Sequence, residues 1–115
     1  MNYRVLTTTW FDREVKRLSK KYPSLKKDIT LFREELIQNV HGGRSLGGGA
    51  FKWRLAVKSK GKGKSGGMRV ITYLEVDIIL KDISNIFFLS IYDKSEVGSI
   101  SSDEIKRRVK SVRTR

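Results

Sequence analysis

The sequence predicts an α+β fold: an N-terminal helix hairpin packed on one face of a small, mainly antiparallel twisted sheet, followed by a short C-terminal helix. Changes in the hydrophobic period carry this prediction. Apolar residues recur every three or four positions up to about residue 38, every second position between about residues 52 and 92, and helically again after residue 101. With 115 residues and no visible repeat or linker, we expect one domain over residues 1–115.

The first 22 residues are predicted to form a strand and a helix. Tyr3–Thr8 is β-prone, and Thr9 with Asp12 three residues later fits a capping box, so Thr9 is the expected N-cap. The only proline, Pro23, stops this helix. Its apolar face carries Phe11, Val15, Leu18 and Tyr22.

A second helix is predicted directly after the proline. Ser24 is its expected N-cap, and its apolar face carries Leu25, Ile29, Phe32 and Leu36. Because the connection is so short, the two helices should form an antiparallel hairpin.

The second half of the chain is predicted to form three strands and a helix. Residues 39–50 contain five glycines and are expected to be a flexible connection. The period-two pattern then predicts strands over Lys52–Lys58, Gly67–Val76 (with an extension through Leu80) and Ile86–Tyr92. Ser101 or Ser102 caps the last helix, and the basic residues 106–115 are expected to fray.

Alternation assigns the two faces of this sheet. The face toward the helices is expected to carry Trp53, Leu55, Val57, Val70, Leu74, Phe87, Leu89 and Ile91. The opposite face then presents Lys52, Arg54, Lys58, Arg69, Tyr73 and Tyr92. Exposed phenols beside cations suit the stacking of single-stranded bases. The alternative is that Tyr73 and Tyr92 fill a second, smaller core under the C-terminal helix.

The charge balance points to an anionic partner. Twenty-five Lys and Arg against twelve Asp and Glu give a formal net charge of +13, and residues 37–73 contain eight basic residues and no acidic one. Nucleic acid is the commonest partner for such a domain, and an acidic protein or a membrane surface comes next.

Several function classes are disfavoured by composition. The chain has no cysteine and a single histidine, His41, so we expect no disulfide, no metal site and no cofactor. No apolar run reaches the length of a membrane helix, and the N-terminus does not resemble a signal peptide. We therefore expect a cytoplasmic protein without a membrane partner.

Residues 58–70, KSKGKGKSGGMRV, place four lysines at every second position among glycines. Gly63-Lys64-Ser65 matches the end of a Walker A loop, but Lys58 stands where its first glycine is required. A strand rather than a helix is predicted to follow, which also argues against a dinucleotide site. The remaining interpretation is a hairpin loop whose lysines contact a nucleic-acid backbone.

The segments KSKGKGKSGGMRVITY and IFFLSIYDKSE, in this order after a strand and a helix hairpin, resemble the RelE/ParE superfamily of toxin–antitoxin toxins, close to its HigB-like branch. The resemblance is strongest over residues 51–96. It implies a RelE-like fold and a cytoplasmic toxin that cleaves mRNA in the ribosomal A site without metal until a cognate antitoxin binds it. The last strand lacks the arginine or histidine that many such nucleases carry there, which leaves the general acid and base open.

Candidate site residues follow from the chemistry of RNA cleavage by its own 2′-hydroxyl. Arg69 is the first candidate for clamping the phosphate, because its guanidinium is rigid and always charged. The other catalytic candidates are Lys58, Lys60, Tyr92 and Lys94, and the RNA-binding candidates are Lys52, Arg54, Lys62, Lys64 and Tyr73.

Two other functions remain open at this stage. Some superfamily members act on DNA gyrase without nuclease residues, and a non-catalytic basic RNA-binding module would share the same charge pattern. The expected partners of the favoured interpretation are mRNA, ribosomal RNA and an acidic antitoxin protein.

Overall fold

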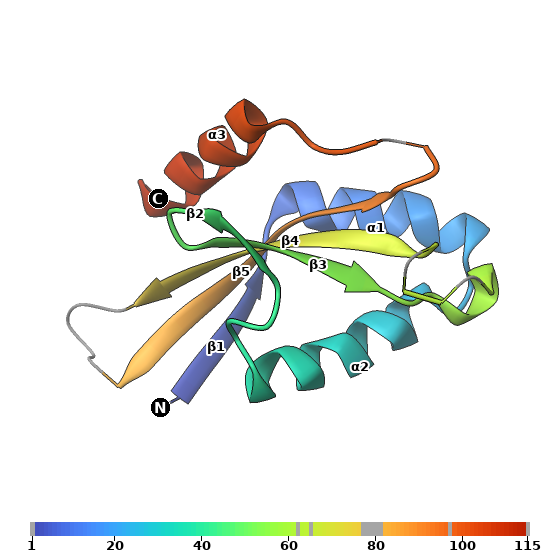
Figure 1. Cartoon of the computed structure of the whole chain (residues 1–115), viewed down its shortest axis with the longest axis horizontal. Coiled ribbons are helices and arrows are strands. Elements are labelled where there is room, and N and C mark those ends of the chain that lie inside the picture. The colour runs from blue at the N-terminus through green and yellow to red at the C-terminus, as the bar shows by residue number, and fades with distance from the viewer. Residues whose placement is uncertain (1, 62, 65, 77–81, 97, 115) are drawn as a thin grey trace.

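The computed structural model describes residues 2–61, 63–64, 66–76, 82–96 and 98–114. In chain order the elements are β1 (Asn2–Thr7), α1 (Thr9–Lys21), α2 (Leu25–Gln38), β2 (Arg44–Gly47), β3 (Ala50–Leu55), the 3-10 turn η1 (Lys58–Lys60), β4 (Met68–Val76), β5 (Ile83–Asp93) and α3 (Ser102–Arg113). The strands form one sheet in the order β1-β5-β4-β3-β2, in which β1 and β5 are parallel and the other pairs antiparallel. The helix hairpin packs on one face of this sheet and α3 on the other. Figure 1 shows α2 and α3 at opposite sides of the strands. The predicted α+β architecture is confirmed.

The start of α1 differs by one residue from the prediction. Thr8, and not Thr9, is the N-cap: its Oγ1 accepts a hydrogen bond from the backbone N–H of Phe11 at 3.3 Å. The same hydroxyl donates to the carbonyl oxygen of Phe88 in β5 at 2.9 Å. Thr8 is preferred because it joins the helix to the neighbouring strand, which Thr9 does not do.

The helix hairpin covers the larger core, as predicted. Leu18 of α1 and Leu25 and Leu36 of α2 are almost fully buried there. The side chains that meet them from the sheet include Leu55, Met68, Val70, Ile86, Phe88 and Ile91. Phe88 packs against Phe11 and Phe32, with ring centroids 5.0 and 6.0 Å apart.

The glycine-rich connection is not only a flexible link. Arg44–Gly47 forms the edge strand β2 and pairs with β3 through Arg44–Lys52 and Ser45–Phe51. The prediction missed it because every residue of this strand is exposed, so it has no apolar alternation.

The strand predicted over Lys52–Lys58 is β3, which begins earlier at Ala50 and ends at Leu55. Lys58 therefore lies in η1 and not on the sheet. The predicted extension of β4 through Leu80 falls outside the described residues.

The face assignment of β5 was wrong for Phe87 and Leu89. The pairing of β4 with β5 is irregular between Ile71 and Thr72: Ile71 lies opposite Ser90 and Thr72 opposite Phe88, so β5 carries one extra residue, a bulge. As a result Phe88 packs toward the helix hairpin, and Phe87 and Leu89 lie on the other face.

That other face is a second core under α3, and not an exposed cationic surface. Tyr73 and Tyr92 are buried there, with 6% and 5% of their surface exposed, which is the alternative that the sequence left open. Ile105 and Val112 of α3 close over them. The chain expected to fray from residue 106 is helical through Arg113, because the apolar side chains of its inner face are buried against the sheet.

Candidate nucleic-acid interface

A cavity of about 660 Å³ opens beside β3, where the short strand β2 no longer covers the sheet edge. It is lined by Phe32, Glu35, Asn39, Gly42, Gly43, Arg44, Lys52, Trp53, Arg54, Lys64, Arg69, Tyr92, Lys94 and Gly98. Among these described residues, six are lysines or arginines and one is a carboxylate. The cavity is therefore a strongly cationic recess, which favours a polyanion.

Arg69 and Tyr92 lie next to each other at the wall of this cavity. They are paired across β4 and β5, and each is about 95% buried. Nη1 of Arg69 donates to the carbonyl oxygens of Lys64 and Met68, both at 3.2 Å, which ties the guanidinium to the lysine–glycine loop. The hydroxyl of Tyr92 is buried and has no hydrogen-bond partner among the described residues.

The base of the lysine–glycine loop is held by two buried carboxylates. Asp28 of α2 accepts hydrogen bonds from the hydroxyl of Ser24 at 2.6 Å and from the backbone N–H of Lys58 at 3.2 Å. Ser24 in turn accepts from the backbone N–H of Ser59 at 2.9 Å. The turn η1 is thereby fixed to the start of α2, and this is why the chain leaves the sheet after Leu55.

The second carboxylate is Asp93, at the end of β5. The ammonium of Lys60 lies 2.7 Å from Asp93 Oδ1, and the two side chains are 7% and 0% exposed. Tyr22 donates to Asp93 Oδ2 at 2.9 Å, and Ser95 donates to Oδ1 from both its backbone and its hydroxyl. Lys60 therefore holds the loop through a buried ion pair.

Burial tends to raise the pKa of Asp93. The hydrogen bonds from Lys60, Ser95 and Tyr22 outweigh it and hold the pKa well below its ordinary value. Asp93 is thus ionised throughout the physiological range, and the ion pair with Lys60 persists there.

The structure brings six of the predicted site residues to the cavity: Lys52, Arg54, Lys64, Arg69, Tyr92 and Lys94. Lys58 is exposed on η1 and does not line the cavity, and Lys60 is committed to Asp93. Tyr73 lies under α3, where it stacks on Phe87 with centroids 6.2 Å apart, so it cannot stack on a base as predicted. Lys62 falls outside the described residues.

Sequence reasoning missed the contributions of α2 and of the loop before β2. Arg44 and Glu35 line the cavity together with Trp53, whose indole N–H donates to the hydroxyl of Thr72 at 2.9 Å. A Cβ on Gly43 would lie 2.7 Å from the indole ring of Trp53, so only glycine lets the loop pass this closely. The glycine cluster was the available signal, since close backbone approach is one of the reasons for a glycine.

A second cavity, of about 890 Å³, lies between α3 and the β2–β3 hairpin. Leu46, Ile105 and Val109 give it a more apolar lining, and it contains neither Arg69 nor Tyr92. The smaller cavity is therefore the better candidate for phosphate chemistry, because the charges and the unpartnered phenol gather there.

A comparison with protein families identifies the family of this chain. The family model described as the RelE toxin of the RelE/RelB toxin–antitoxin system matches residues 3–114. The chain belongs to the RelE toxin family. It is thus the toxin of a type II toxin–antitoxin system, a RelB-type antitoxin is its implied partner, and toxins of this family are typically ribosome-dependent endoribonucleases.

The cavity lining of this RelE-family toxin combines cationic side chains with a buried phenol. Its lysines and arginines can neutralise a phosphate chain, and Arg69 presents a planar fork held by two carbonyl oxygens. Tyr92 lies opposite Arg69 in the sheet and places its ring at the same cavity. In the described part of the chain, no helix is long and apolar enough to cross a membrane.

Proposed function

We propose that this RelE-family toxin is an endonuclease that cleaves mRNA in the ribosomal A site, in the cytoplasm, without a metal ion. We also place it in the HigB-like branch, on the basis of the segments KSKGKGKSGGMRVITY and IFFLSIYDKSE. The observation that carries the proposal is the cationic cavity, in which an unpartnered phenol stands beside a buried arginine.

In the proposed reaction, the 2′-oxygen of one nucleotide attacks the adjacent phosphorus and the bond from phosphorus to the 5′-oxygen breaks. The products are a 2′,3′-cyclic phosphate and a free 5′-hydroxyl. Charge accumulates on the non-bridging oxygens in the transition state, and pre-positioned cations stabilise it there. Arg69 is the clamp for these oxygens, with Lys64 and Lys94 beside it at the cavity.

Two protons must move in this reaction. Tyr92 is the proposed general acid: a phenol is protonated at neutral pH and can give its proton to the departing 5′-oxygen. Glu35 is the only carboxylate among the described lining residues, and we assign it the proton of the 2′-hydroxyl. So few carboxylates among so many cations disfavour a bound divalent metal, whose ligands are mainly oxygen anions.

Lys52, Arg54 and Arg44 line the same cavity and are assigned to binding of the RNA backbone. Lys58 is on the exposed turn η1, outside the cavity, where it can contact ribosomal RNA. Lys60 has no chemical role in this proposal, because its ammonium is held by Asp93.

The proposal is tested by mapping mRNA 5′ ends in bacteria after brief induction of the toxin. Wild type should produce new ends in phase with codons, and Arg69→Ala should produce none while remaining folded by circular dichroism. Lys27→Ala, which removes one exposed charge on α2 away from the cavity, is the matched control and should cleave like wild type.

Other outcomes identify other functions. Growth arrest without new ends would reject cleavage and point to a non-nucleolytic target such as DNA gyrase. Neither arrest nor new ends would leave a basic RNA-binding module.

A further inference from the structure

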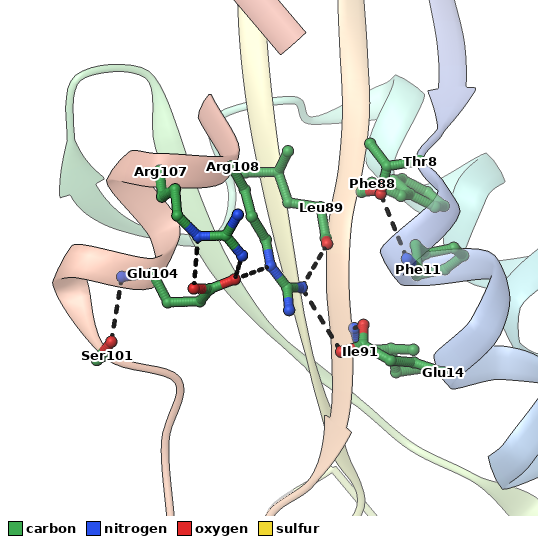
Figure 2. Close-up of polar contacts among 10 residues, drawn as sticks. All are labelled: Thr8, Phe11, Glu14, Phe88, Leu89, Ile91, Ser101, Glu104, Arg107 and Arg108. Atoms are coloured by element: carbon green, nitrogen blue, oxygen red, sulfur yellow. Dashed lines mark hydrogen bonds and ion pairs between the residues drawn. The ribbon is translucent and has the colours of Figure 1, made fainter. Parts of the chain in front are cut away.

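On the edge of β5 that faces away from β4, side chains bind the backbone of Phe88, Leu89 and Ile91 where the strand β1 has ended. β1 pairs with β5 only as far as Thr7 opposite Phe88, where the chain turns into α1. From there the hydroxyl of Thr8 donates to the carbonyl oxygen of Phe88 at 2.9 Å. Arg108 of α3 donates to the carbonyl oxygen of Leu89 at 2.9 Å, and Glu14 of α1 accepts from the backbone N–H of Ile91 at 3.1 Å (Figure 2).

Two of these bonds lie at the bulge of β5. Leu89 is the residue skipped in the pairing with β4, which resumes with Ser90 opposite Ile71, and Ile91 follows opposite Val70. Leu89 and Ile91 point to opposite faces of the sheet although two positions separate them. The side chains of Glu14 and Arg108 therefore bind the backbone where the strand changes its facing.

The bulge decides where Tyr92 points. In an unbroken strand Tyr92 would share the face of Phe88, which packs on the helix hairpin. With the extra residue, Tyr92 instead lies opposite Arg69 on the other face, at the cationic cavity. The position of Tyr92, the proposed general acid, thus depends on the β5 bulge, where the hydrogen-bonded pairing with β4 is interrupted.

Arg108 joins three elements at this point. Its guanidinium lies 3.5 Å from Glu14 of α1 and 2.7 Å from Glu104 of α3, and 5.2 Å from the ring centroid of Trp10. Its side chain is 12% exposed and that of Glu14 is 25% exposed. Figure 2 shows Arg108 reaching β5 from α3 and Glu14 reaching it from α1.

We propose that Glu14 and Arg108 are positioning residues that hold the β5 bulge and thereby keep Tyr92 aligned with Arg69 for RNA cleavage. The inference rests on the proposed function for its catalytic part. Neither residue lines the cavity, so both act through the strand.

The test is single-turnover cleavage of mRNA on purified ribosomes, at saturating and at limiting ribosome concentrations. Arg108→Ala should lower the saturated rate by roughly 100-fold, the loss expected for a misplacement of about 1 Å. The ribosome concentration at half-saturation should stay within about two-fold. Arg107→Ala is the matched control, because Arg107 also pairs with Glu104 and carries the same charge but is more exposed. Figure 2 draws no contact between Arg107 and β5.

A double-mutant cycle separates positioning from general stability. If Arg108 acts through Tyr92, then Arg108→Ala should cost little more in a Tyr92→Phe background. Glu14→Gln keeps an oxygen for the N–H of Ile91 and should retain more of the rate than Glu14→Ala. Equal losses from Arg108→Ala in both backgrounds, or an unchanged rate, would overturn the inference.

A readout without RNA keeps the inference separate from the proposed function. In Glu14→Ala and Arg108→Ala the ring resonances of Tyr92 should shift and the Ile91 amide should exchange faster, while Arg107→Ala leaves both unchanged. Unmoved resonances would overturn the inference. A wild-type toxin that does not cleave would reject the proposed function alone, and these resonances would still decide whether the two residues hold the strand.

Discussion

Replacing Tyr92 by phenylalanine should separate stability from activity. The change removes one hydroxyl, which is buried at the cavity wall and has no hydrogen-bond partner among the described residues. A buried hydroxyl without a partner costs about 1–3 kcal/mol relative to its hydrated state. The free energy of unfolding of Tyr92→Phe should therefore equal or exceed that of wild type, by up to about 3 kcal/mol, since the ring and its packing are kept.

The same substitution should strongly reduce cleavage. A positioned general acid contributes about 10²–10⁴-fold to a rate, which is about 2.7–5.4 kcal/mol of the activation free energy. Urea titration measures the stability, and single-turnover cleavage on ribosomes programmed with mRNA measures the rate. A stabilised but slow variant is the expected combination.

Two controls isolate the hydroxyl of Tyr92. Ser19→Ala removes the other unpartnered buried hydroxyl, on α1, and should leave cleavage unchanged. Tyr73→Phe removes a phenol from the core under α3, outside the cavity, and should also keep the cleavage rate. Full activity of Tyr92→Phe would refute its role as general acid. A loss of more than about 1 kcal/mol of stability would refute the absence of a partner for its hydroxyl.

Three further predictions concern the scaffold, each measured by urea denaturation of purified protein. Lys60→Met should lower the free energy of unfolding by about 3–5 kcal/mol, because it leaves the Asp93 carboxylate buried without a counter-charge. Adding Asp93→Asn should recover much of this loss. Additive losses from the two substitutions would contradict the pairing. The pKa of Asp93 is lower in the folded than in the unfolded state, where it is near 3.8. The ionised carboxylate therefore stabilises the fold above that pH, and this stabilisation is lost as the pH falls below it. Asp93→Asn should thus flatten the decline of stability between about pH 4 and pH 2. Gly67→Ala should lower stability by at least about 1–3 kcal/mol, because a Cβ there would lie 2.0 Å from the carbonyl oxygen of Leu55. Gly98→Ala is the control: its φ is not positive and its new Cβ would meet open space, so it should leave the stability almost unchanged.

The fold was predictable wherever one face of a helix or strand is buried and the other is exposed to solvent. That condition holds for α1 and α2, whose apolar positions repeat at helical spacing and reach one core. β5 does not meet it: from Ser84 to Asp93 every residue is buried, so the sequence has no polar alternation to report the bulge. The facing of Phe87 and Leu89 could therefore be found only from the pairing with β4.

The sequence predicts which kinds of residue form the candidate site, but not which individual residues line the cavity. Lysines on a glycine-rich loop look alike in sequence, yet Lys64 lines the cavity and Lys60 is buried against Asp93. The two lysines differ because Lys60 pairs with Asp93, which lies 33 positions later in the chain and which no local sequence pattern indicates. Alternation places Tyr73 and Tyr92 together, either as an exposed pair or as a second core, and cannot separate them. In the structure both are buried under α3, and only Tyr92 also lines the cavity.

Asp93 and Glu104 are paired with cations outside the cavity, whereas the lining of the cavity is strongly cationic. Asp93 is paired with Lys60, and hydrogen bonds from Arg107 and Arg108 lower the pKa of Glu104 to about 2. Asp93 joins β5 to η1 and to the end of α1, whereas Glu104 pairs with cations of its own helix, and both lie outside the cavity. The described lining of the cavity has six cationic side chains and one carboxylate, so this single recess carries a net formal charge of +5, part of the +13 of the chain. Because few carboxylates lie among the described residues of the recess itself, the lysines and arginines around Arg69 can attract a phosphate chain there.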